Sequence, residues 1–176
     1  MSNIESTVDW IMCGIYACAG QVCSANSRLL VHEDCADDIL ELLKAKTEQV
    51  AVGNPFDEST QMGPLVSKEQ HQKVHNAIGK AVAEGCTALA GGSTPEFEDQ
   101  SLQGGYFVEP TILVGLPEKA SAWDEEIFGP VGFCRLYHMN ALNVGCMCRY
   151  CRCVYSRLKK KLLRWQMPQI MGWQMQ

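Results

Sequence analysis

Residues 27–43 read SRLLVHEDCADDILELL, and two apolar patterns in this stretch indicate the fold class. The first is a short apolar run over residues 27–32, which predicts a buried parallel strand. The second repeats at i, i+3, i+4 and i+7, the spacing of one face of a helix, and consists of Ala36, Ile39, Leu40 and Leu43. Asp34 precedes this face as a candidate N-cap. A strand followed by a helix is the repeating unit of parallel α/β sheets.

The same alternation continues downstream. Ser67 and Gln70 form a capping box for a second helix, and Gly85 stands at the C′ position that ends it. The apolar face of this helix is Val74, Ala77, Ile78, Ala81 and Val82. Residues 86–90 then predict a short strand, and residues 106–114 an extended stretch broken at Pro110. We therefore predict an α/β fold with a parallel sheet and flanking helices.

Upstream of the first strand, a helix over residues 7–18 leads into a loop of small residues that contains Cys23. Because the side chains around this cysteine are small, a substrate carbonyl could reach the sulfur and a backbone N–H together. The same pattern also fits an inert, buried cysteine, because free cysteine is among the most buried residue types. Gln21 and Asn26 flank this cysteine and are predicted to shape the loop through hydrogen bonds to backbone.

Charge divides the 176-residue chain into two parts. Its formal net charge of −5 combines −13 over residues 1–126 with +8 over residues 127–176, which hold no acidic residue. We place the domain boundary just beyond Val131, with a domain over residues 1–131 and a basic, Cys-rich tail over residues 132–176. Four thiols in the tail, Cys146, Cys148, Cys151 and Cys153, suit zinc or copper(I), although chance composition explains them as well. The tail is predicted to be disordered.

Two further patterns bear on location and metal binding. The chain has no apolar run of about 18 residues and no secretory signal, so we predict a cytoplasmic protein without a membrane span, and with free thiols. His71 and His75 are four residues apart on one predicted helix. The zinc-protease pattern needs a Glu between them, which is missing here, so we predict a solvated helix face and no metal site.

Five blocks in a fixed order carry a resemblance to a known family. Gly20-Gln21-Val22-Cys23 resembles the nucleophile motif of the aldehyde dehydrogenase superfamily, and residues 125–131, EEIFGPV, resemble its cofactor-side motif. Between them, residues 53–55 (GNP), 62–66 (MGPLV) and 105–111 (GYFVEPT) are similar to other family blocks. Within the superfamily, these motifs most resemble those of betaine and amino-aldehyde dehydrogenases.

The resemblance implies a reaction and three site residues. Cys23 would attack an aldehyde, a hydride would pass to NAD or NADP, and water would release the carboxylic acid from a thioester. Glu126 would hydrogen-bond the nicotinamide ribose, and Phe128 would pack beside the nicotinamide ring. The implied partner is an aldehyde substrate, not a nucleic acid. Ala17 stands where related amino-aldehyde enzymes often have an aromatic ring, which argues against a quaternary-ammonium substrate.

The chain also departs from the family's pattern. The family's general base lies in a Glu-Leu-Gly-Gly-Lys-like segment, which is not found here, nor are its oxyanion Asn and most of its dinucleotide fold. Family members are oligomers, and the oligomerisation segment is also missing. We therefore expect the isolated chain to be an inactive part of a catalytic domain. The alternative is a non-catalytic fragment that associates with full-length subunits or binds metal through its Cys-rich tail.

Overall fold

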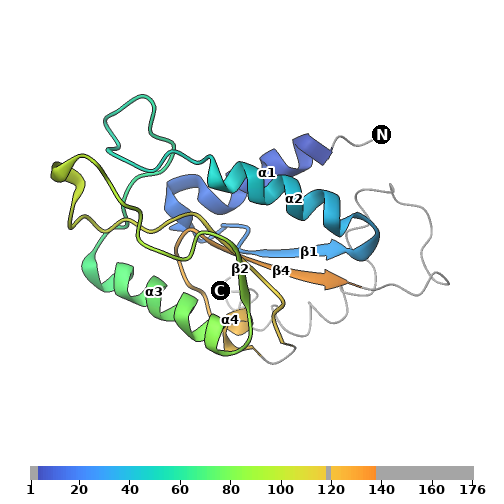
Figure 1. Cartoon of the computed structure of the whole chain (residues 1–176). Helices are drawn as coiled ribbons and strands as arrows, with labels where there is room; N and C mark the ends of the chain where they lie inside the picture. Colours follow the sequence, from blue (N-terminus) through green and yellow to red (C-terminus); the bar gives the residue numbers. More distant parts are fainter. Residues whose placement is uncertain (1–3, 118–119, 138–176) are drawn as a thin grey trace, which may run out of the picture. The chain divides into compact units, whose positions relative to one another are not determined.

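A computed structural model describes residues 4–117 and 120–137, which form an α/β arrangement around a four-stranded sheet (Figure 1). The strand order is β1-β4-β3-β2. Parallel pairing joins β1 (Arg28–His32) to β4 (Val131–Tyr137), and β4 to β3 (Thr111–Val114). In Figure 1, α1 (Ile4–Tyr16) and α2 (Ala36–Glu48) run along one face of the sheet, and α3 (Lys68–Ala83) and α4 (Ser121–Asp124) along the other. The predicted fold class is confirmed.

The edge strand β2 (Thr87–Ala90) is antiparallel to β3, so the sheet is mostly and not wholly parallel. Parallel neighbours in one sheet need a crossover connection, which is usually a helix. The link between β2 and β3, residues 91–110, contains only the 3-10 turn η3 (Gln100–Leu102). The chain therefore reverses at this edge of the sheet.

The predicted cap of α2 is wrong. Asp34 lies inside a 3-10 turn, η2 (Glu33–Cys35), and the helix begins at Ala36 after Cys35, which makes no side-chain capping bond. The backbone N–H of Asp34 donates instead to Nδ1 of His32, at 3.2 Å. With this bond His32 caps the 3-10 turn, so the chain begins to turn at Glu33, before the predicted cap at Asp34.

Helix α3 begins at the Ser67 cap and ends at Gly85 as predicted, but the Gln70 side chain bonds elsewhere and does not complete the capping box. Ser67 Oγ accepts a hydrogen bond from the backbone N–H of Gln70 at 3.2 Å. At the other end Gly85 has φ 104°, and the N–H groups of Gly85 and Cys86 bond to the carbonyls of Val82 and Ala81. This pair of hydrogen bonds is a Schellman motif, which requires a residue that readily adopts positive φ at the position of Gly85. Both ends of the helix are therefore held by local chemistry.

Ser67→Ala should lower the free energy of unfolding by about 1 kcal/mol, because the N–H of Gln70 loses its side-chain acceptor. Urea unfolding followed by circular dichroism measures the change. Ser67→Asp, which keeps an acceptor at the same position, is the matched variant and should retain most of the stability. Equal losses in the two variants would contradict the capping role.

The core lies between the sheet and the long helices. Ile15 from α1, Leu43 from α2, Val74 from α3 and Phe133 from β4 are each 2% exposed or less. The strand β4 runs to Tyr137, so ordered structure continues past Val131, while the domain boundary itself stays a prediction. The four cysteines at 146–153 lie outside the described residues. Within residues 4–117 and 120–137, every helix is too short or too polar to cross a bilayer.

Candidate active site

Cys23 is an exposed thiol in the turn that connects the end of α1 to β1. The chain approaches it through η1 (Ala17–Gly20), where three successive residues have positive φ: Cys18 (52°), Ala19 (55°) and Gly20 (69°). Two of these are not glycine, and such residues rarely adopt this conformation. Backbone strain of this kind persists where the surroundings enforce it, and it clusters at functional sites.

Gln21 holds this strained turn in place. Its backbone N–H and its side-chain Nε2 both donate to the carbonyl of Cys18, each at 3.2 Å. Its side-chain Oε1 accepts from the backbone N–H of Val66 at 2.9 Å, in a segment 45 residues away. The predicted loop-shaping role of Gln21 is confirmed, and it ties the Cys23 loop to the stretch that leads into α3.

Among the described residues, the backbone N–H of Cys23 has no hydrogen-bond partner. An unpaired N–H beside an exposed sulfur is what a developing oxyanion needs when a thiolate adds to a carbonyl. The buried thiols differ. Burial raises the pKa of Cys134 to about 12, and burial together with the nearby Glu84 carboxylate raises the pKa of Cys86. These two thiols are buried, the setting of an inert cysteine, whereas the Cys23 thiol is exposed.

Iodoacetamide at pH 8 should therefore alkylate Cys13, Cys18 and Cys23 in the folded protein and leave Cys35, Cys86 and Cys134 unmodified. The first three are exposed and the last three buried, and only a thiolate reacts. Peptide mass mapping before and after addition of urea checks the pattern, since unfolding should make all six reactive. Protection of Cys23 in the folded state would contradict its placement.

The cofactor-side motif follows α4 as an irregular segment whose carbonyls are held by side chains. Gln70 Nε2 donates to the carbonyls of Ile127 and Phe128, both at 2.8 Å. Arg28, at the start of β1, donates to the carbonyls of Trp123 at 2.7 Å and Glu125 at 3.3 Å. Phe128 has φ 61°, another strained non-glycine conformation. Three of these four bonds hold carbonyls of the irregular segment, and the fourth, to Trp123, holds a carbonyl of α4.

The Cys23 loop and the Phe128 turn meet at their backbones. A Cβ atom on Gly20 would lie 2.0 Å from the carbonyl oxygen of Gly129, closer than real Cβ atoms approach any neighbour. Gly20 precedes Cys23 by three residues, and Gly129 follows Phe128 directly. The structure thus brings together two predicted motifs that are about a hundred residues apart in the sequence.

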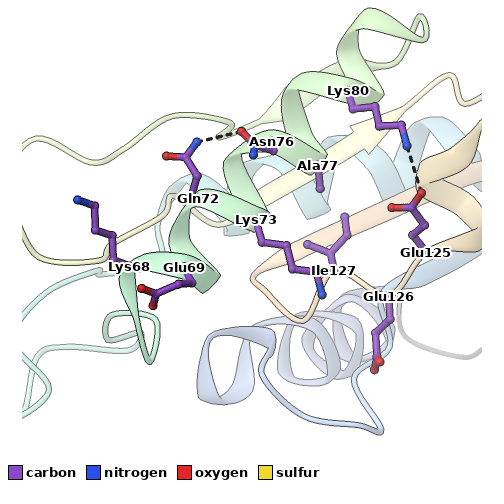
Figure 2. Close-up of a pocket in the computed structure, with 10 residues that line it drawn as sticks. All are labelled: Lys68, Glu69, Gln72, Lys73, Asn76, Ala77, Lys80, Glu125, Glu126 and Ile127. Atoms are coloured by element: carbon purple, nitrogen blue, oxygen red, sulfur yellow. Dashed lines mark hydrogen bonds and ion pairs between the residues drawn. The ribbon is translucent and has the colours of Figure 1, made fainter.

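A groove of about 700 Å³ runs between α3 and the Glu125–Ile127 stretch (Figure 2). Figure 2 shows Lys73 reaching from α3 toward this stretch, and Lys80 forms an ion pair with Glu125 at 3.1 Å. The remaining lining residues are Lys68, Glu69, Gln72, Asn76 and Ala77, together with Glu126. Sequence reasoning missed Lys73, because a lysine on a helix predicts only a solvated face. Only the fold, which brings α3 close to Glu126, shows that Lys73 lines the groove.

Comparisons with known proteins agree with these motifs. The sequence profile of the aldehyde dehydrogenase family matches residues 1–140. The chain is 41% identical over 129 residues to betaine aldehyde dehydrogenase of Atriplex hortensis, covering 73% of this chain and 25% of that protein. It is 42% identical over 131 residues to aminoaldehyde dehydrogenase 2 of Zea mays, covering 74% of this chain and 25% of that protein.

Among solved structures, betaine aldehyde dehydrogenase of Staphylococcus aureus in complex with NAD+ is similar, with a TM-score of 0.74 and 36% sequence identity. The match covers 78% of this chain and 27% of that one. The chain spans about a quarter of the length of the curated relatives it matches.

Proposed function

This chain belongs to the aldehyde dehydrogenase family, and on that premise we propose that Cys23 is the nucleophile of an aldehyde oxidation that uses NAD+ or NADP+. The observation that carries the proposal is the backbone contact between Gly20 and Gly129. This contact joins the loop of the exposed thiol to the turn of Glu126 and Phe128. A nucleophile and a hydride acceptor must lie side by side on one substrate carbon.

The Cys23 sulfur, as thiolate, would add to the aldehyde carbon, and the C=O electron pair would move to oxygen. The Cys23 backbone N–H would donate to that oxyanion. A bound nicotinamide would supply the acceptor for the hydride that leaves the same carbon. The resulting thioester would be cleaved by water to the carboxylic acid and the free thiol.

The chain's own residues suit one side of such a cofactor. Glu126 is exposed at the groove, where its carboxylate can accept from paired ribose hydroxyls, and Phe128, two residues further along the chain, is half-buried. The three lysines of the groove, Lys68, Lys73 and Lys80, are matched by three glutamates, Glu69, Glu125 and Glu126, so the lining has no net charge. We assign Glu126 and Phe128 to the cofactor on these grounds.

For the substrate we propose an aldehyde of the amino-aldehyde class, because the similar proteins carry the names betaine and aminoaldehyde dehydrogenase. Ala17 is exposed near Cys23 and has no ring, so the chain offers no cation–π contact at that position. For location we propose a reducing compartment, because the six cysteines of the described part are all free thiols.

A chimaera tests the nucleophile directly. Residues 4–131 of this chain would replace the matching segment of the Staphylococcus aureus enzyme, and NADH formation from NAD+ with an ω-amino-aldehyde, and separately with betaine aldehyde, would be followed at 340 nm. We expect NADH formation that is lost in the Cys23→Ser chimaera. Activity that survives Cys23→Ser would overturn the proposal, and Cys18→Ser is the matched control.

The 176-residue chain by itself should form no NADH under the same conditions. We propose that it carries the nucleophile and one side of the cofactor site but not a complete catalytic centre. The assay uses purified protein with an ω-amino-aldehyde or betaine aldehyde, and with NAD+ or NADP+ in turn. NADH or NADPH formation that disappears in Cys23→Ala would show that this expectation is wrong.

A further inference from the structure

His71 and His75 face each other on α3 in the structure. Their Nε2 atoms are 3.2 Å apart, and the ring centroids are separated by 4.5 Å at an interplanar angle of 67°. Both side chains are half-buried. Neither imidazole contacts the thiol loop or the cofactor-side turn through any hydrogen bond of the described residues.

Two oxygen atoms approach the same nitrogens. The carbonyl of Phe107 lies 3.0 Å from His71 Nε2, and the hydroxyl of Thr94 lies 3.2 Å from His75 Nε2. A carbonyl can only accept, so His71 carries its hydrogen on Nε2 in this bond. The Nε2 of His75 is then an acceptor, toward the hydroxyl of Thr94 and toward His71. The four groups come from α3 and from the two loops on either side of η3.

The spacing of the two nitrogens matches that of metal ligands. Zinc binds imidazole nitrogen at about 2.0–2.1 Å in tetrahedral sites, which places two such nitrogens about 3.3 Å apart. We infer that His71 and His75 form a two-imidazole site for a divalent transition-metal ion such as Zn²⁺. Binding moves the hydrogen of His71 from Nε2 to Nδ1, and both Nε2 lone pairs then point to the ion.

The donor set selects the class of metal. Imidazole nitrogen suits zinc, copper and nickel, whereas magnesium and calcium require oxygen ligands. Among the described residues no third His, Cys, Asp or Glu joins the pair, so neutral oxygens and water would complete the coordination.

The test is a titration of the metal-free full chain with Zn²⁺ at pH 7.5, after its exposed thiols have been blocked with iodoacetamide. Isothermal titration calorimetry gives the affinity, and NMR of the histidine rings identifies the ligands. We expect the resonances of His71 and His75 to shift while those of His32 do not. Mg²⁺ should shift none of them.

The variants His71→Gln and His75→Gln make the test quantitative. A chelate needs both rings, so each single variant should weaken Zn²⁺ binding at least about tenfold. The double variant should weaken Zn²⁺ binding about as much as either single variant does, because the loss of one ring already breaks the chelate. Unchanged affinity in the double variant would overturn the inference. If these variants fail to fold, the ring shifts of the unsubstituted chain decide alone, and static His71 and His75 resonances overturn it. Cys23→Ala should bind Zn²⁺ normally, which separates this site from the proposed reaction.

Discussion

Gly20→Ala is expected to lower the free energy of unfolding by about 3 kcal/mol, the upper end of what overpacking costs in a dense interior. The new Cβ would lie 2.0 Å from the carbonyl oxygen and 2.4 Å from the carbonyl carbon of Gly129. Both obstacles are backbone atoms, which cannot rotate away as a flexible side chain would. Gly20 also has φ 69°, a conformation that alanine adopts only at a further cost.

Gly79→Ala is the matched control, because it makes the same chemical change with the opposite expected sign. Gly79 is exposed within α3, and nothing lies within 4 Å of its added Cβ. Alanine there should raise the stability by about 0.5–1 kcal/mol through its greater helix propensity. Urea unfolding of both variants by circular dichroism gives the two values. A Gly20→Ala protein as stable as Gly79→Ala would show that the two loops do not meet as described.

Elements with local chemical signals were predictable from the sequence. The helix α3 has its cap at Ser67 and its stop at Gly85, and both signals operate within a few residues. The run that became β1 is apolar enough to indicate burial on its own. The prediction of Asp34 as an N-cap was wrong. Asp is a common N-cap residue, whereas the competing acceptor, His32, is a weaker and rarer signal.

The antiparallel direction of β2 and the geometry of the site depend on contacts between distant segments. Residues 86–90 have the same pattern whichever way the strand runs, so the direction of β2 has no local signal. The Gln70 amide was read as half of a capping box, and its donation to the carbonyls of Ile127 and Phe128 depends on the fold bringing α3 to that turn. The positive φ of Cys18, Ala19 and Phe128 has no sequence signal either, because tertiary contacts impose the strain on residues that disfavour it.

Cys23→Ala is expected to abolish rapid acylation of the chain by p-nitrophenyl acetate, an activated ester that needs no cofactor. Attack of a thiolate on this ester releases p-nitrophenolate and leaves the acetyl group on sulfur, the same kind of thioester as in the proposed reaction. The free N–H of Cys23 can stabilise the oxyanion of that step. Cys13 is also exposed, but it lies inside α1, where helical hydrogen bonds occupy the backbone N–H groups.

The rate of p-nitrophenolate release, with peptide mass mapping of the acetyl group, measures the difference between the thiols. Cys23 should be acylated at least about tenfold faster than Cys13, since loss of one oxyanion donor costs that much or more in related chemistry. Cys13→Ala is the matched variant and should leave the rapid phase intact. If Cys13→Ala and Cys23→Ala slow the reaction equally, exposure alone governs these thiols. In the proposed reaction the backbone N–H of Cys23 stabilises the oxyanion, so equal rates would mean that this N–H has no such effect. Cys23 would then retain the family's motif without its reactivity.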